Sequence, residues 1–363
     1  MSELELKLVR IKNLLAKHQA DALLLQRVSS FAWATCGGAS YINTASTTGV
    51  GSLLITSKGR YLITDNIEAP RFEKEEKLAA QGWEFKVAPW YGANPAIAEL
   101  TQGLKLAADV PFPGAIDLSD EMARLRANLL SEEDARYRAL SKLCAEAMDA
   151  AIRAVRPGQS EFEIAALLDR ETFARGVQPI VNLIATDERI FNFRHPLPYS
   201  KKLQKYAMLV LCGRQHGLVT SITRLVHFGR LPDEVRQKME GVARIDAAFI
   251  AATRPGRTLG DVFKRATDEY RAVGFADEWQ LHHQGGPAGY EPREYLGVPN
   301  SPDTVEVGQV YAWNPSITGA KSEDTVLIGP SSNEVMTEIP GWPMLKIEVD
   351  GQTWQRPAIL EIV

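Results

Sequence analysis

The sequence predicts a two-part α/β protein, in which a small α/β part precedes a larger part made of two similar halves. Three observations lead to this prediction. Helix and strand patterns alternate over the first third of the chain, which is typical of an α/β layer. The pattern changes near residue 128, where a long helix is expected to begin. The segment Arg-Pro-Gly, followed by a helix start, then occurs at both Arg156 and Arg254.

The first part, residues 1–128, is predicted from its hydrophobic periodicity. Apolar residues follow helical spacing near the N-terminus, whereas ADALLLQ is a continuous apolar run of strand length. Two further apolar runs, separated by a Gly-containing turn, indicate a hairpin. The expected elements are a helix over 4–16, a strand over 20–26, a hairpin over 49–65 followed by another helix, a strand over 85–90 and a helix near 95–103.

The second part, residues 129–363, contains an internal repeat. The spacing of 98 residues that separates Arg156 from Arg254 also separates two expected helix caps, Ser160 and Thr258. Ser and Thr are favoured at helix N-caps because their side chains accept a hydrogen bond from a free backbone N–H. Since the caps and the helix phase agree, a duplication explains the pattern better than chance does.

Each predicted helix pair is followed by a loop and a strand hairpin, over 177–229 in the first copy and 280–329 in the second. Two helix pairs over two hairpins predict a curved antiparallel sheet, with helices on one face and a cavity between the halves. The spacing of the repeat carries His195 onto Arg293. These two side chains are therefore expected to face one another across the cavity.

Composition excludes several kinds of partner. The chain has 363 residues, a formal net charge of −4 and a pI near 6.0, which argues against nucleic acid and anionic membranes as partners. The sequence contains no run of 18 apolar residues, so no membrane span is predicted. The N-terminus carries acidic residues within its apolar pattern, so a helix is expected there rather than a signal peptide.

Cysteine usage points to a reducing compartment. The three cysteines, Cys36, Cys144 and Cys212, are odd in number, far apart and without CxxC spacing. Reduced thiols in the cytoplasm are therefore expected, and no disulfide framework is predicted.

The segment LVLCGRQHGLVTSITRLVHFG, residues 209–229, has the form of a metal-binding hairpin without its ligands. Two apolar strands flank a Gly-bounded turn and end in Thr223-Arg224, yet the segment contains neither Asp nor Glu. Three later segments complete the pattern: HHQGGPAGYEPRE (282–294), AWNP (312–315) and SEDTVLI (322–328).

With these segments, the chain resembles the creatinase, prolidase and aminopeptidase P superfamily over nearly its whole length. The resemblance implies a creatinase-like N-terminal domain over 1–128 and a duplicated C-terminal domain of the pita-bread fold over 129–363. Metallopeptidases of this superfamily bind two metal ions through two Asp, one His and two Glu. The resemblance also implies a homodimer.

Most of these ligands are replaced in this chain. By resemblance, Ser221 stands at one aspartate position and Leu211, within a residue of error, at the other. Gly286 occupies the position of the ligand histidine, and Asn314 occupies the position of one glutamate. The other glutamate is retained as Glu323. One carboxylate and a few weak donors cannot offset the charge of two divalent ions, so no metal and no other cofactor is predicted.

His195, in NFRHPLP, is the predicted general acid–base. Histidine suits the role because its pKa lies near neutrality. In creatinase, which hydrolyses a C–N bond of a small guanidino acid without metal, the histidine at this place is the acid–base. From the residues alone, a structural histidine before Pro196 is the commoner explanation.

Glu323 is the second predicted catalytic residue. In a cavity lined by Leu211 and Trp313, burial would raise its pKa and make it an acid–base group or an anchor for a cation. An ion pair with Arg224 is the alternative, and both interpretations stay open.

The other predicted site residues would bind substrate. Arginine binds carboxylates through two parallel hydrogen bonds, so a basic set predicts a carboxylated substrate. His283 is preferred over His282 because adjacent strand residues point to opposite faces. The predicted substrate-binding residues are Arg194, Arg224, His283, Glu291, Arg293, Asn314 and Ser221.

Cys212 and Ser221 are candidate nucleophiles. Cysteine within the apolar run LVLC is usually a small buried hydrophobic residue, and Ser221 fills the space of a lost acid. Neither is therefore predicted to attack the substrate.

The leading prediction is a metal-independent hydrolase that cleaves a C–N bond of an amide, amidine or guanidine in a small carboxylated substrate. Creatinase has a glutamate where this chain has Ser221, so its substrate contacts do not transfer whole. A non-catalytic pita-bread binding module is the first alternative. The second is an Xaa-Pro metallopeptidase with relocated ligands, which would need His282 or His283 to converge with Glu291 and Glu323.

Overall fold

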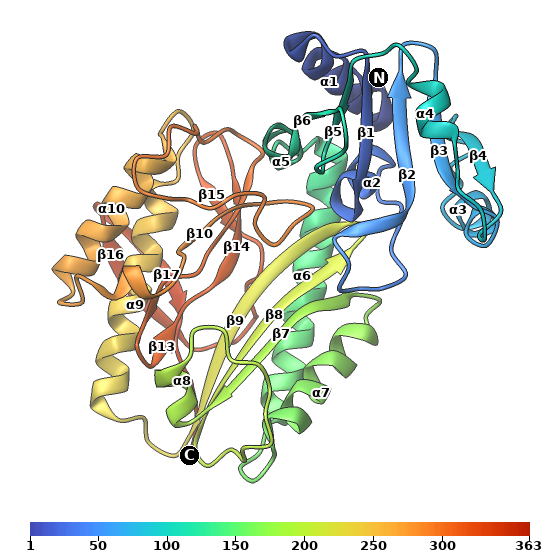
Figure 1. Ribbon diagram of the computed structural model, residues 1–363. Helices are drawn as coiled ribbons and strands as arrows, with labels where there is room; N and C mark the ends of the chain where they lie inside the picture. Colours follow the sequence, from blue (N-terminus) through green and yellow to red (C-terminus); the bar gives the residue numbers. More distant parts are fainter. The chain divides into compact units, whose positions relative to one another are not determined.

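A computed structural model describes residues 1–363 and is drawn in Figure 1. The chain divides into two compact units. One comprises Met1–Ala127 with the hairpin tip His216–Leu218, and the other comprises Asn128–Gln215 with Val219–Val363. Both units combine helices with β-sheets, which confirms the predicted α/β (α+β) class.

The first unit is built on a six-stranded sheet in the order β4-β3-β2-β1-β5-β6. Strands β1, β2 and β3 pair antiparallel, whereas β4, β5 and β6 join the sheet in parallel register. The elements are α1 (Glu3–His18), β1 (Ala22–Arg27), α2 (Val28–Ala34), β2 (Thr48–Thr56), β3 (Arg60–Asp65), α3 (Ala69–Lys74), β4 (Glu84–Ala88), α4 (Ala96–Leu100), β5 (Leu106–Ala108), β6 (Ile116–Asp117) and α5 (Ser119–Ala127).

The first half of the second unit places two helices against an antiparallel hairpin. Figure 1 shows α6 and α7 beside β7 and β8; α7 contacts both strands, and α6 contacts β8. The elements of this half are α6 (Ser131–Ala154), α7 (Glu161–Phe173), β7 (Gln178–Thr186), α8 (Glu188–Asn192), β8 (Tyr206–Gln215) and β9 (Leu218–Phe228). Strand β8 lies between β7 and β9 in the sheet.

The second half repeats this plan and adds a C-terminal extension. Its four-stranded sheet has the order β10-β11-β14-β15, and a backbone hydrogen bond from Thr223 to Glu323 joins it to β9. The elements are α9 (Asp233–Ala252), α10 (Leu259–Ala272), the 3₁₀ helix η1 (Glu278–Leu281), β10 (Gly285–Ala288), β11 (Val310–Trp313), β12 (Ser316–Ile317), β13 (Ala320–Lys321), β14 (Asp324–Ile328), β15 (Asn333–Val335), β16 (Met344–Val349), β17 (Gln352–Pro357) and β18 (Leu360–Ile362).

Backbone hydrogen bonds at the start of α7 and α10 support the predicted duplication. Ser160 and Thr258 each cap their helix through the side-chain oxygen. In the first copy Gly158 N donates to Leu203 O at 2.8 Å, and in the second Gly256 N donates to Val305 O at 2.9 Å. The repeated sequence therefore folds into repeated local structure.

A buried charge network anchors the C-terminal extension. Arg356 on β17 is 1% exposed, and its Nη2 lies 2.6 Å from both Asp246 Oδ2 on α9 and Asp324 Oδ2 on β14. The other oxygen of Asp324 accepts hydrogen bonds from Arg224 and Thr337. Buried charges are tolerated when paired in this way. The network fixes the start of β14, directly after Glu323.

No helix of the structure combines the length and the apolarity needed to cross a lipid bilayer.

Candidate functional site

A cavity of about 490 Å³ in the second unit collects most of the chemically active residues. Its wall is largely aliphatic, and its polar groups come from five separate segments of the chain. The lining residues are Val181, Leu183, His195, Val210, Cys212, His283, Pro292, Arg293, Leu296, Asn314, Lys321 and Glu323. The structure thus brings together five predicted site residues: His195, His283, Arg293, Asn314 and Glu323.

His195 lies on a loop that other residues hold firmly. The loop follows α8, and Asp187 before that helix accepts hydrogen bonds from three backbone amides of residues 204–206. Arg189 on α8 donates to Leu197 O at 3.0 Å, two residues beyond His195. These contacts fix the backbone on both sides of the histidine, which is exposed to the cavity.

Three histidines meet at one end of the cavity. Nε2 of His195 lies 3.0 Å from Nε2 of His282, and the His283 ring centre is 5.4 Å from that of His195 and 4.5 Å from that of His282. His283 lines the main cavity, whereas His282 lines a small adjoining hollow. His283, the residue preferred from the sequence, is the one that lines the main cavity, although both rings approach His195. Both lie before β10 begins at Gly285, where regular strand alternation does not apply.

All three imidazoles are held in their neutral form at neutral pH. Burial, followed by the charge of Lys321, lowers the pKa of His282 to about 2. Burial and then Arg293 lower the pKa of His283 to about 4. The pKa of His195 is lowered from 6.5 by burial and by Lys321. Neutral imidazole can accept a proton, so His195 satisfies the first requirement of a general base.

Glu323 is an ionised carboxylate with a full set of partners. Its Oε1 accepts from Arg293 Nη2 at 2.8 Å, and its Oε2 contacts Thr223 Oγ1 at 2.6 Å and Lys321 Nζ at 3.0 Å. Burial alone would raise the pKa of Glu323, but Lys321 and Arg293 together lower it well below its usual range. The predicted acid–base role is therefore wrong, because a carboxylate held by two cations gives up and takes up no proton near neutral pH.

The expected surroundings of Glu323 also need correction. Trp313 lies in the hydrophobic core, stacked on Phe249 with ring centres 4.4 Å apart, and does not line the cavity. Leu211 is absent from the lining as well. Its neighbours Val210 and Cys212 line the cavity. Alternate residues of a strand share a face, so the aspartate position of the resemblance falls on Cys212 rather than on Leu211.

Arg293 and Lys321 carry the positive charge at the place where the resemblance implies two metal ions. Arg293 Nη1 donates to Ser221 Oγ at 3.0 Å while its Nη2 binds Glu323, so one guanidinium joins two former ligand positions. The cavity supplies Cys212, Asn314 and a single carboxylate that two cations already neutralise. Such a donor set does not fit a dinuclear centre of hard divalent ions.

Cys212 is unsuited to act as a nucleophile. Its Sγ lies 3.3 Å from Ser221 Oγ, and burial followed by the charge of Glu323 raises the pKa of the thiol to about 11. Because the thiolate is the reactive form, the residue stays an inert thiol at neutral pH.

Four predicted substrate-binding residues do not line this cavity. Arg224 is buried, and its side chain forms an ion pair with Asp324 at 2.8 Å. The expected ion pair between Arg224 and Glu323 is therefore wrong, because the partner is the next residue along the chain. Arg194 binds Glu278 Oε2 at 2.6 Å and lines only the hollow beside His282. Glu291 is not among the lining residues, and Ser221 is buried behind Arg293.

Lys321 lines the cavity and binds Glu323, although the sequence motifs did not indicate it. The strand period of two is a signal for it, since residues 321 and 323 fall on the same face when the segment is extended. The motif SEDTVLI begins one residue after Lys321 and therefore does not include it.

Gly286, at the position of the ligand histidine, cannot carry a side chain in this backbone. A Cβ placed there would lie 2.4 Å from Tyr295 O and 2.8 Å from Gly297 N, and both are backbone atoms that cannot rotate away. The loop segment 295–297 therefore occupies the space that a histidine ligand would need.

We expect Gly286→His to lower the free energy of unfolding by about 1–3 kcal/mol, because backbone must move to admit the ring. Gly92→His is the matched control, since a Cβ at Gly92 meets only Pro89 O, at 3.7 Å. Urea unfolding monitored by circular dichroism measures both variants. Equal stability of the two would contradict the steric argument.

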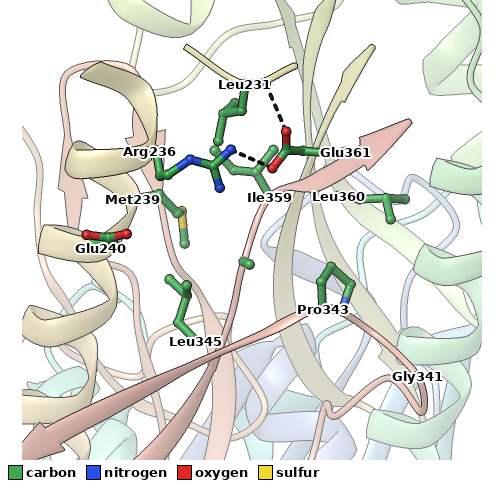
Figure 2. A pocket seen from close by; sticks show the side chains of 11 residues that line it. Leu231, Arg236, Met239, Glu240, Gly341, Pro343, Leu345, Ile359, Leu360 and Glu361 are labelled. Atoms are coloured by element: carbon green, nitrogen blue, oxygen red, sulfur yellow. Dashed lines mark hydrogen bonds and ion pairs between the residues drawn. The ribbon is translucent and has the colours of Figure 1, made fainter. Parts of the chain in front are cut away.

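A second cavity in the same unit is lined by none of the predicted site residues. Figure 2 shows this cavity, of about 380 Å³, between apolar side chains such as Met239, Leu345 and Ile359. Its carboxylate Glu361 accepts from Arg236 Nη2 at 2.8 Å and from Leu231 N at 2.9 Å. No histidine, cysteine or hydroxyl side chain lines it, and its ionisable groups are Arg236, Glu240 and Glu361.

The fold places the protein in the pita-bread class. Residues 135–330, more than half of the chain, match the sequence pattern of metallopeptidase family M24, and the chain belongs to this family. The family assignment confirms the superfamily that the sequence motifs indicated.

Individual relatives are more distant. An uncharacterized peptidase of Staphylococcus epidermidis is 27% identical over 152 residues, which cover 40% of this chain and 43% of the relative. The agropine synthesis cyclase of Rhizobium rhizogenes is 31% identical over 140 residues, covering 36% of this chain and 35% of that protein. The chain thus spans less than half the length of these relatives.

Among solved structures, an Xaa-Pro dipeptidase from Bacillus anthracis superimposes with a TM-score of 0.78. The superposition covers 99% of this chain and 100% of that one, at 19% sequence identity. At this identity the likeness establishes the fold, which confirms the predicted pita-bread architecture.

Proposed function

We propose that this protein is a hydrolase that cleaves a C–N bond in a small carboxylated molecule without the two-metal centre of its family. The observation that carries the proposal is the Arg293–Glu323–Lys321 cluster, in which side-chain cations lie against the one remaining acidic ligand position. Charge that metal ions supply in a metallopeptidase is supplied here by the chain itself.

His195 is the proposed general base. When His195 donates its Nε2–H to Nε2 of His282, its Nδ1 lone pair remains available to a water molecule. As the water oxygen bonds to the substrate carbon, Nδ1 takes the water proton. The C–N bond then breaks, and the same proton passes from His195 to the departing nitrogen. No oxidant, metal or cofactor is needed for the balance.

The cavity favours a substrate with one anionic and one apolar part. Two cations and one carboxylate leave the Arg293–Glu323–Lys321 cluster with a net charge of +1, which attracts a carboxylate. Val181, Leu183 and Leu296 form an aliphatic wall around it. Oδ1 of Asn314 is buried without a hydrogen-bond partner, so it is placed to accept a substrate N–H.

The proposal is tested by incubating the protein, after exhaustive dialysis against a chelator, with N-acyl amino acids, amidino acids and guanidino acids. We expect amine or ammonia release to persist unchanged by the chelator. Each active acid is compared with its primary amide, which keeps the shape and removes the charge. The amide should react about 10–100-fold more slowly, as expected for a lost charged hydrogen bond.

Activity that disappears on chelation and returns with Mn²⁺ would overturn the metal-independent mechanism. A thermal-shift response to these acids without any turnover would instead favour the binding-module alternative.

A further inference from the structure

Three histidines that occupy none of the family's metal-ligand positions form a cluster of nitrogen ligands. His195, His282 and His283 each offer a ring nitrogen, and these atoms all lie within 4.8 Å of one another. The cluster joins two segments of the chain, the loop after α8 and the end of η1, which lie 87 residues apart in sequence. The proposed hydrolysis uses His195 as a base and gives the other two rings no direct chemical task.

We propose that these three histidines form a binding site for one transition-metal ion of the Cu²⁺, Ni²⁺, Zn²⁺ or Co²⁺ type. The site differs from the dinuclear position of the family in its ligands, its charge and the ions that it selects.

The spacing of the nitrogens fits one small ion. Metal–imidazole bonds of about 2.0–2.1 Å place the nitrogens of a tetrahedral site about 3.4 Å apart. The His195 and His282 Nε2 atoms are already 3.0 Å apart. Because the outermost pair is at most 4.8 Å apart, small rotations of the rings close the remaining gap.

Unpartnered ring nitrogens are the second observation. His282 is 8% exposed, and its Nδ1 is buried without a hydrogen-bond partner. Nδ1 of His283 is likewise buried and unpartnered. Buried polar atoms are nearly always satisfied, so two orphaned nitrogens in adjacent rings call for a ligand. Each ring gives one nitrogen to an ion, so a metal ion satisfies an Nδ1 atom only where the ring binds through that atom.

Charge decides which ions fit. Lys321 and Arg293 lie near the cluster, and Glu323 offsets only one of them. Hard ions such as Mg²⁺ and Ca²⁺ bind through the charge of oxygen ligands, which are missing here. Imidazole forms strong bonds with the later first-row metals, so we expect the order Cu²⁺ above Ni²⁺ above Co²⁺. The surrounding positive charge also favours an anion, such as hydroxide or a carboxylate, as the fourth ligand.

The test titrates untagged protein with Co²⁺, Ni²⁺ and Mg²⁺. We expect one Co²⁺ per chain by calorimetry, the visible absorption of tetrahedral cobalt, and no heat with Mg²⁺. His282→Gln and His283→Gln should each weaken Ni²⁺ binding by at least about 10–100-fold, the range seen when even an outer-shell partner is lost. His216→Asn is the matched control, because His216 is exposed and tolerates Asn at its φ of 50°.

Three outcomes would overturn the site: no Co²⁺ binding, equal binding of Mg²⁺, or Ni²⁺ affinity that survives in the folded His282→Gln/His283→Gln double variant. Thermal unfolding shows whether each variant is folded. None of these measurements needs a substrate, so the metal site and the proposed hydrolysis fail independently. If both hold, the ion occupies the catalytic histidine, and added Ni²⁺ inhibits turnover rather than activating it.

Discussion

His195→Ala lowers kcat/KM by about 10²–10⁴-fold, the loss expected when a positioned general base is removed. The other cavity groups replace it poorly, since Glu323 is bound by two cations, Cys212 is a thiol at neutral pH, and burial lowers the pKa of His283 to about 4, which makes it a weaker base. The variant should bind substrate about as well as the parent, because the Arg293–Glu323–Lys321 cluster is untouched. Steady-state kinetics on an identified substrate, with binding measured by calorimetry, separate the two effects.

The dependence of kcat/KM on pH distinguishes a catalytic role of His195 from a structural one. The base must be deprotonated, and burial and Lys321 lower the pKa of His195 below 6.5. In the parent, kcat/KM should therefore rise with pH along an acid limb below pH 6.5 and then level off. The residual activity of His195→Ala should lack this limb, whereas His216→Asn should keep it. Full turnover by His195→Ala would remove the proposed base.

Arg356→Met lowers the free energy of unfolding by about 3–5 kcal/mol, as expected when one partner of a buried ion pair is removed. The substitution keeps an unbranched apolar stem but leaves Asp246 without its arginine, at a position where both groups are 1–2% exposed. Asp324 loses one of its two arginines. Chemical denaturation followed by tryptophan fluorescence measures the change.

The matched control for Arg356 is an exposed ion pair. Arg138 and Glu334 lie 2.9 Å apart with side chains 46% and 49% exposed. Exposed pairs contribute about 0–1 kcal/mol, so Arg138→Met should be nearly neutral. Adding Asp246→Asn to Arg356→Met should recover part of the lost stability, because it removes the uncompensated charge. A loss no larger than that of the control would mean that the network does not anchor the C-terminal extension.

Periodicity and local caps were enough to predict much of the fold. The apolar spacing of residues 4–16 and the run at 20–26 correspond to α1 and β1, and the caps Ser160 and Thr258 begin α7 and α10 as expected. These features depend on neighbours within a few residues. The hairpin of β16 and β17 was not predicted, because Arg356 holds it through contacts with Asp246, 110 residues earlier in the chain.

The sequence predicted which residues line the candidate site better than it predicted their protonation. His195, His283, Arg293, Asn314 and Glu323 all line the cavity. The pKa of Glu323 was predicted to move in the wrong direction, since burial was considered without Lys321 and Arg293. A sequence shows which groups titrate, but the sign of a shift depends on which charges the fold places within a few ångströms.

The close approach of Tyr295 and Gly297 to Gly286 has a consequence for protein engineering. A histidine at Gly286 fits only if the backbone at Tyr295 and Gly297 moves, because no side-chain rotation provides that space. Installing a dinuclear centre in this cavity by mutagenesis therefore has to begin with the backbone of residues 295–297.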